Sequence, residues 1–221
     1  GLHGRSLPAA VAAKIANEKL TVIVDTDDGD SYGEGGNHFI HNMRRNVDIT
    51  HFVHDNQIYG LTKGQSSPTS NEGQITDVQT TGNSNTPLNP MLMAIASGAG
   101  FVARAFSGDP THLISIMKQA ISYEGYAIVD ILQPCISFNK VNTFAYYKSR
   151  VYHLEEGYDS SNKIVALEKA LENDDKIPIG VIYQESKPTF HQKNKILSSG
   201  VPLVDTKMDL ELVQKFIKEF I

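Results

Sequence analysis

The chain has 221 residues, of which 40% are hydrophobic and 20% charged, and its net charge is −5. This composition is typical of a globular domain whose core needs no disulfides. It excludes nucleic acid as the main partner, because no basic run is present, and it contains no apolar run long enough to span a membrane. The single cysteine, Cys135, excludes an internal disulfide and favours a reducing, cytoplasmic compartment.

Apolar segments rich in β-branched residues alternate with segments of helical periodicity. The predicted strands are 20–25, 49–54, 100–105, 126–132 and 178–183. The predicted helices are 8–17, 36–45, 90–97, 110–123, 161–172 and 208–220, and Pro8, Pro90 and Pro110 stand where three of them would begin. Several strands are apolar on both faces, as in a parallel sheet between two layers of helices. The pattern predicts one doubly wound α/β domain over residues 1–221, with a mostly parallel sheet and helices on both faces.

The segment 62–90 differs from the rest of the chain. It is rich in Ser, Thr, Asn, Gly and Pro and has no usable period. We interpret it as a long loop, and a loop of that length inside a compact domain is usually functional or disordered.

Acidic and glycine-rich residues (25–30) follow the first predicted strand, and polar residues (55–60) follow the second. A right-handed crossover would place both strand ends side by side, where ligands bind to open parallel sheets. Carboxylate and amide oxygens there could hold Mg²⁺, and backbone amides at the glycines could hold a diphosphate.

Other interpretations of this acidic turn exist. A solvated loop has the same composition, and a phosphotransferase with an aspartate nucleophile would also place acids after a strand. A calcium loop of the EF-hand type fails, because the fifth position counted from Asp25 is Gly29 instead of an acid.

Short motifs along nearly the whole chain carry a more specific signal. They are His3-Gly4-Arg5, Asp28-Gly29-Asp30, Gly35-Gly36-Asn37-His38-Phe39-Ile40-His41, Arg44-Arg45-Asn46, Asp55-Asn56-Gln57-Ile58-Tyr59-Gly60-Leu61-Thr62-Lys63-Gly64-Gln65, Leu132-Gln133-Pro134-Cys135, Phe138-Asn139 and Lys176-Ile177-Pro178-Ile179-Gly180. Together they resemble the β subunit of 2-oxoacid:ferredoxin oxidoreductases, and the run 55–65 is the most specific of them. The resemblance implies a thiamine diphosphate-binding fold.

The resemblance also implies residue roles. Asp28, the Asn56 side chain and the Ile58 backbone carbonyl would ligate Mg²⁺. The residues in contact with thiamine diphosphate would be His3, Gly29, Asp30, Gly60 and Leu61. Leu61 and Lys63 would lie near the bound 2-oxoacid, where the Lys63 ammonium group could pair with a carboxylate, and Lys63 is the candidate catalytic residue. Without the resemblance, Lys63 would be interpreted as an exposed loop lysine.

Cys135 has two interpretations. A lone cysteine is usually a small buried hydrophobic residue. The resemblance implies instead that Cys135 supplies one thiolate to a 4Fe–4S cluster, which normally needs four cysteines. We expect the other three in an N-terminal segment that would precede Gly1, so that the chain would be a truncated subunit.

Position 27 departs from the resemblance, which has glycine there. Asp27 adds negative charge beside a diphosphate, and its Cβ could obstruct a close backbone approach, so we expect weaker cofactor binding. The resemblance assigns no ligand role to four further histidines. His38 and His41 share a helix face, whereas His51 and His54 lie on opposite faces of a strand. We expect structural roles for all four.

The expected function is oxidative decarboxylation of a 2-oxoacid such as pyruvate or 2-oxoglutarate, with coenzyme A as acyl acceptor and ferredoxin as electron acceptor. Activity would require the partner α (or α and γ) subunit, because the glutamate that activates the cofactor comes from there. The alternative is a non-catalytic fragment or diverged relative that keeps the fold and a partner surface. An acetolactate synthase-like enzyme is a third possibility, but it would leave Gln133-Pro134-Cys135 without a role.

Overall fold

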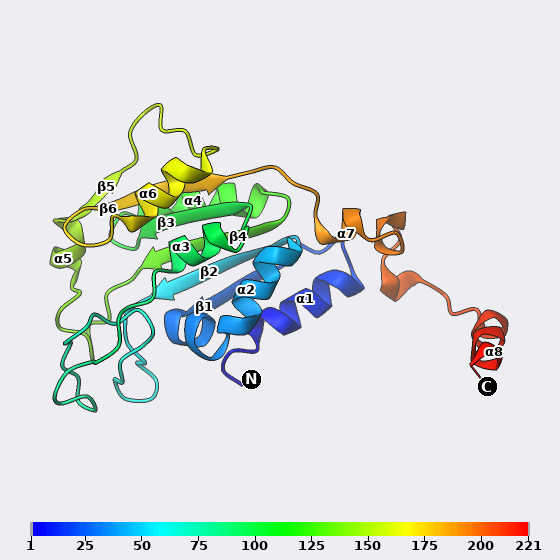
Figure 1. Cartoon of the computed structure of the whole chain (residues 1–221), viewed down its shortest axis with the longest axis horizontal. Helices are drawn as coiled ribbons and strands as arrows, with labels where there is room; N and C mark the ends of the chain where they lie inside the picture. Colours follow the sequence, from blue (N-terminus) through cyan, green and yellow to red (C-terminus); the bar gives the residue numbers. More distant parts are fainter. Residues whose placement is uncertain (1, 221) are drawn as a thin grey trace.

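The computed structural model describes residues 2–220, and its centre is a six-stranded sheet (Figure 1). The strands are β1 (Ile23–Asp27), β2 (Ile49–Asp55), β3 (Phe101–Phe106), β4 (Tyr126–Leu132), β5 (Val151–His153) and β6 (Ile177–Gln184). Their order across the sheet is β1-β2-β4-β3-β6-β5. The first four strands of this order are parallel, whereas β6 is antiparallel to β3 and parallel to β5. The prediction of a mostly parallel sheet is confirmed.

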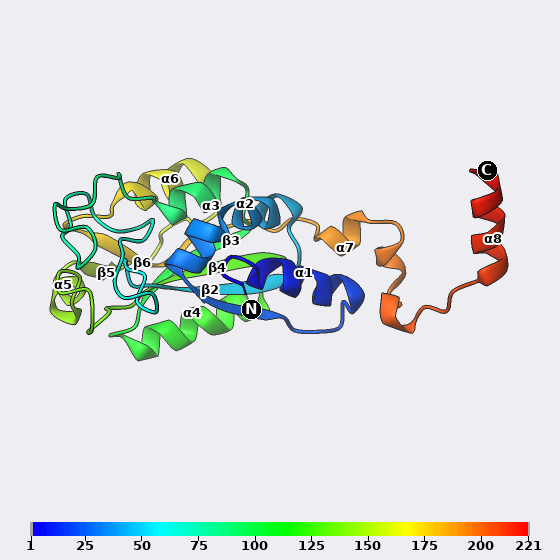
Figure 2. The same ribbon diagram turned by 90° about the horizontal axis from the view of Figure 1, so that it is seen from below.

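Helices cover both faces of the sheet, as predicted. The α-helices are α1 (Ser6–Ala16), α2 (Gly36–Arg45), α3 (Pro90–Ala96), α4 (Pro110–Ser122), α5 (Phe144–Lys148), α6 (Lys163–Leu171), α7 (Phe190–Lys193) and α8 (Leu210–Glu219). The larger core packs α1, α2, α3 and α6 on one face, and a second core packs α4 on the other. Figure 2 shows α2, α3 and α6 on one side of the sheet and α4 on the opposite side.

Alternation within β4 shows why these strands are apolar on both faces. Tyr126 and Ile128 belong to the larger core, whereas Ala127, Val129 and Ile131 belong to the core under α4. Because successive side chains of a strand point to opposite faces, a strand between two helical layers is mostly apolar on both faces.

Two predicted boundaries were wrong at the N-terminal end. The strand predicted over 20–25 lies at Ile23–Asp27, because residues 17–20 form a turn that the ammonium group of Lys14 fixes by donating to the Leu20 carbonyl (2.7 Å). The helix predicted to begin at Pro8 begins at Ser6, whose hydroxyl donates to the Asp30 carboxylate. The elements α5, β5 and α7 were not predicted, since elements of three to five residues carry too little periodicity.

The C-terminal helix α8 stands apart from the sheet (Figures 1 and 2). None of its side chains is buried. Across residues 2–220, no helix has the length and apolar character that crossing a membrane would require.

Candidate functional site

The carboxyl ends of β1 and β2 lie side by side, because the two strands are parallel neighbours in the sheet. Asp28 directly follows β1, and the backbone N–H of Asn56, directly after β2, donates to its Oδ1 at 3.4 Å. The Asn56 side-chain oxygen accepts in turn from the backbone N–H of Ile58 at 3.0 Å. The structure thus brings together the three residues to which the resemblance assigns Mg²⁺.

The Asp28 carboxyl group is fully buried, and no ion pair within residues 2–220 involves it. Its Oδ2 lies 2.8 Å from the Thr69 hydroxyl, which also lies 2.7 Å from Oδ1 of Asp55. Burial raises the pKa of Asp28 to about 6 and raises the pKa of Asp55 well above its usual value. A buried carboxylate without a basic partner favours a bound cation, and carboxylate, amide and backbone carbonyl oxygens, the groups that the resemblance assigns here, are ligands that Mg²⁺ takes.

Gly29 begins a π-helical turn, Gly29–Glu34, that packs against the turn after β2. A Cβ added at Gly29 would lie 2.2 Å from Cε1 of Tyr59, so the tyrosine ring requires glycine there. The Tyr59 hydroxyl lies 3.3 Å from the Glu34 carboxylate. At Gly60, by contrast, the nearest atom to an added Cβ is in the Phe138 ring at 4.0 Å, which leaves space.

The Asp30 carboxylate binds the start of the chain. It accepts from the Gly4 backbone N–H at 2.7 Å and from the Ser6 hydroxyl at 3.0 Å, and it lies 3.5 Å from Nδ1 of His3. The Asp27 carboxylate accepts from the Asp30 backbone N–H at 2.7 Å. Asp27 therefore caps the turn that Gly29 begins, and this gives the residue a structural role at a position where glycine was expected.

Leu61 and Lys63 lie on an exposed turn, in which the Lys63 N–H donates to the Gly60 carbonyl at 3.2 Å. Leu61 is 82% exposed, and Lys63 has a φ of 87°, in the left-handed region. Both are accessible to a small molecule, and within residues 2–220 no hydrogen bond or ion pair fixes the Lys63 ammonium group toward the Asp28 site.

Cys135 lies at intermediate depth in the loop that follows β4. The Asn139 side chain of this loop donates to the Asn56 carbonyl at 3.1 Å, so the cysteine loop contacts the turn that carries Asn56. As the chain's single cysteine, Cys135 supplies at most one thiolate, and the residues of this chain do not by themselves fit a 4Fe–4S cluster. No group of three His, Cys, Asp or Glu side chains within residues 2–220 is arranged to hold a metal ion.

A buried polar group near this site was missed by the sequence analysis. Arg104 and Asp130 are register partners on β3 and β4, each only 1% exposed, and Nε of Arg104 lies 3.4 Å from Oδ2 of Asp130. The Tyr32 hydroxyl donates to the other Asp130 oxygen at 2.9 Å. The sequence feature that could have revealed this pair is one charged residue in each of two otherwise apolar strands. Thr69 gave no such signal, because it lies in the irregular segment 62–90.

The two histidines of β2 face opposite sides of the sheet, as their spacing predicts. His51 is buried, its ring nitrogens lying 2.8 Å from the Tyr126 hydroxyl and 3.0 Å from the Thr26 and Ser31 hydroxyls. Burial lowers the pKa of His51 to about 3, so the ring is neutral at physiological pH. On the other face, Nε2 of His54 lies 2.7 Å from the Asp25 carboxylate.

Two protein-family models match the chain. The model of the thiamine pyrophosphate enzyme, C-terminal TPP binding domain, matches residues 1–131. The model of the C-terminal part of the pyruvate ferredoxin oxidoreductase beta subunit matches residues 135–199. The second match includes β5 and β6, which extend the sheet formed by the strands of the first.

Individual proteins are similar over most of the chain. The 2-oxoacid:ferredoxin oxidoreductase subunit beta of Saccharolobus solfataricus is 44% identical over 205 residues, covering 87% of this chain and 67% of the relative. The 2-oxoglutarate synthase subunit KorB of Archaeoglobus fulgidus is 35% identical over 191 residues, covering 86% of this chain and 68% of the relative.

A solved structure is also similar: the 2-oxoglutarate:ferredoxin oxidoreductase from Magnetococcus marinus with 2-oxoglutarate, coenzyme A and succinyl-CoA bound. It superposes with a TM-score of 0.85 at 35% identity, over 98% of this chain and 69% of that chain. The chain thus spans about two thirds of the length of these relatives.

Proposed function

The chain belongs to the family of 2-oxoacid:ferredoxin oxidoreductase β subunits, and from that premise we propose that it binds Mg²⁺ and thiamine diphosphate for the oxidative decarboxylation of a 2-oxoacid. The observation that carries the proposal is the Asp28 carboxyl group, which is buried without a basic partner among the described residues. Mg²⁺ would supply the missing positive charge, with Asn56 and the Ile58 carbonyl as further ligands.

Thiamine diphosphate, when bound, supplies a nucleophilic carbon and an electron sink for decarboxylation. The part of this chain is to hold and orient that group. Gly29 and Asp30, in the turn after β1, and Gly60 and Leu61, in the turn after β2, would line the cofactor, with His3 beside Asp30. Asp28 and Asn56 would bind its diphosphate through the metal ion.

The exposed Lys63 would pair with the carboxylate of the 2-oxoacid. The solved relative that carries 2-oxoglutarate, coenzyme A and succinyl-CoA supports 2-oxoglutarate as one substrate and coenzyme A as the acyl acceptor. The β-subunit family implies an α subunit as partner and ferredoxin as electron acceptor. The single cysteine favours the cytoplasm as compartment. Cys135 would contribute one thiolate to an iron–sulfur cluster, and the other thiolates would have to come from other polypeptide segments or subunits, because this sequence holds no second cysteine.

The alternative is a relative that keeps the fold and a partner surface but binds no cofactor. Asp27 favours this alternative, because its carboxylate occupies the turn that a diphosphate would approach. The two functions differ in one measurable property, the Mg²⁺-dependent affinity for thiamine diphosphate.

Calorimetric titration of the chain with thiamine diphosphate, with and without Mg²⁺, tests the proposal. We expect binding that requires Mg²⁺, that disappears in Asp28→Asn, and that persists in the matched control Asp174→Asn, an exposed loop position. A folded wild-type chain that shows no Mg²⁺-dependent binding would refute the proposal and leave the non-catalytic alternative.

A further inference from the structure

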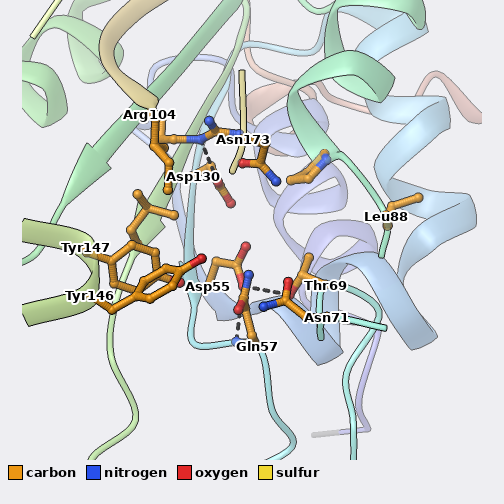
Figure 3. A pocket seen from close by; sticks show the side chains of 13 residues that line it. Asp55, Gln57, Thr69, Asn71, Leu88, Arg104, Asp130, Tyr146, Tyr147 and Asn173 are labelled. Carbon is orange, nitrogen blue, oxygen red and sulfur yellow. Dashed lines mark hydrogen bonds and ion pairs between the residues drawn. The ribbon is translucent and has the colours of Figure 1, made fainter. Parts of the chain in front are cut away.

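A small polar cavity lies behind the turn that carries Asn56 and Ile58, on the larger-core side of the strand ends. Its volume is about 20 Å³, and its polar lining includes Asp55, Gln57, Arg104, Asp130, Tyr147 and Asn173. Figure 3 shows Arg104 and Asp130 on one side of this cavity, Asp55 and Gln57 on another, and Tyr147 beside them. The cavity therefore joins the Arg104–Asp130 pair to the proposed cofactor turn.

Three buried polar atoms of the lining have no hydrogen-bond partner among the described residues: Nη1 of Arg104, the Tyr147 hydroxyl and Oε1 of Gln57. Arg104 and Tyr147 are each only 1% exposed. Leaving a buried donor or acceptor unsatisfied costs about 1–3 kcal/mol per group, so three such atoms around one cavity indicate a ligand that satisfies them.

The chemistry of the lining identifies that ligand. Arg104 offers a donor, Gln57 offers an acceptor, and the Tyr147 hydroxyl can serve as either. The Asp55 and Asp130 carboxyl groups disfavour an anion, and the Arg104 guanidinium disfavours a cation. Water both donates and accepts, and the cavity has room for about one or two water molecules.

The Asn56–Ile58 turn beside the cavity is held by hydrogen bonds between Gln57 and neighbouring residues. Gln57 has a φ of 58°, which is an uncommon conformation for a residue with a side chain. Its backbone N–H donates to Asp55 at 3.2 Å, and its carbonyl accepts from the Ser70 hydroxyl at 2.6 Å. Asp55 shares the Thr69 hydroxyl with Asp28, so a displacement of Asp55 would reach the Asp28 site through one side chain.

We propose that ordered water in this cavity connects Arg104 and Tyr147 to Asp55 and Gln57, and that Arg104 and Tyr147 thereby position the Asn56–Ile58 turn for Mg²⁺. The positioning part rests on the proposed function. Among the described residues, neither Arg104 nor Tyr147 has a hydrogen bond or ion pair to the proposed metal ligands, and both are positioning residues. Partners of this kind typically change metal affinity by about 10- to 100-fold when they are removed.

Tyr147→Phe is the variant of choice, because Arg104→Met would leave Asp130 buried without its cation and could prevent folding. The matched control is Tyr123→Phe, which removes a hydroxyl that donates to the Glu185 carbonyl at 2.7 Å, near the opposite end of β3. Both variants keep the aromatic ring.

Three measurements test whether ordered water and Tyr147 position the Asn56–Ile58 turn. A crystal structure of the wild-type chain should show water within about 3.2 Å of the Arg104 guanidinium and the Tyr147 hydroxyl. In the cofactor-free chain, the amides of Gln57 and Ile58 should exchange with solvent about 3- to 10-fold faster in Tyr147→Phe than in the wild type. The Mg²⁺ concentration that half-saturates thiamine diphosphate binding should rise about tenfold in Tyr147→Phe and stay unchanged in Tyr123→Phe.

A dry cavity in which Arg104 pairs directly with Asp55, or exchange rates that do not differ between the two variants, would overturn the inference. The crystal structure and the exchange rates need no cofactor. If the wild-type chain binds no thiamine diphosphate, the proposed function fails, whereas these two readouts still decide whether water and Tyr147 hold the turn.

Discussion

Replacing Asp28 by asparagine is expected to stabilise the cofactor-free chain at neutral pH while removing its Mg²⁺ site. Asparagine has the same shape and fits the contacts that the structure shows. Its amide oxygen can accept from the Asn56 N–H, and its amide nitrogen can donate to the Thr69 hydroxyl oxygen. The Thr69 hydroxyl is then free to donate to Asp55, which in the wild type competes with Asp28 for the same proton.

The magnitude follows from the pKa of Asp28, which burial raises from 3.8 to about 6. Between these values the folded chain binds more protons than the unfolded chain, so the free energy of unfolding falls as the pH rises from about 4 to about 7. Two pKa units correspond to about 3 kcal/mol, and Asp28 is fully buried, so solvent screening does not reduce this figure. Because the asparagine side chain does not titrate, the free energy of unfolding of the variant does not fall with pH at this position.

Scanning calorimetry in EDTA at pH 4 and pH 7.5 measures the effect. At pH 7.5 the midpoint of Asp28→Asn should exceed that of the wild type by about 6–12 °C, and at pH 4 the two midpoints should nearly coincide. Mg²⁺ should raise the wild-type midpoint at pH 7.5 and leave that of the variant unchanged. A variant that is no more stable than the wild type at pH 7.5 would refute the reasoning that Asp28 is a strained, unpaired acid.

Three further changes give sharp expectations. Asp27→Gly removes a charge beside the proposed diphosphate, so it should tighten Mg²⁺-dependent binding of thiamine diphosphate by about tenfold in calorimetric titration. Equal or weaker binding would show that Asp27 does not hinder the cofactor. Gly29→Ala should lower the free energy of unfolding by about 1–3 kcal/mol in chemical denaturation, because the added Cβ would collide with the Tyr59 ring. The control Gly36→Ala should not lower it, because no neighbouring atom lies within 4 Å of the added Cβ. Deletion of 207–221 should leave the thermal midpoint unchanged, because α8 buries no side chain, and a clear drop would indicate that the segment packs on the sheet.

The fold was largely predictable because its central strands and one helix carry unambiguous local patterns. The strand β4 occupies the predicted range, since its residues are apolar on both faces. The helix α2 also has the predicted bounds, and it ends where Asn46 adopts a left-handed conformation. The first strand was displaced because 20–22 are apolar enough for a strand, whereas in the structure 17–20 form a turn whose Leu20 carbonyl accepts from Lys14.

The candidate site was predictable only where its residues follow strand ends. Asp28 and Asn56 are adjacent in space because parallel neighbouring strands place them there, which the chain order implies. Thr69 is close to both acids only through the path of an irregular segment, and no periodicity predicts such a path. Arg104 and Asp130 could have been paired from sequence, because opposite charges in neighbouring buried strands need each other.

The distribution of charge around the strand ends explains why Asp28, among the buried acids, is suited to a metal ion. Asp130 already has the Arg104 guanidinium and the Tyr32 hydroxyl as partners. Asp55 accepts from Thr69 and from the Gln57 backbone, and it faces the cavity that holds Arg104. Among the described residues, Asp28 has only neutral donors, one of them shared with Asp55. A buried carboxylate without a neighbouring cation either takes up a proton or binds a cation. Asp28 is therefore the buried acid whose ionised form a bound Mg²⁺ would stabilise most.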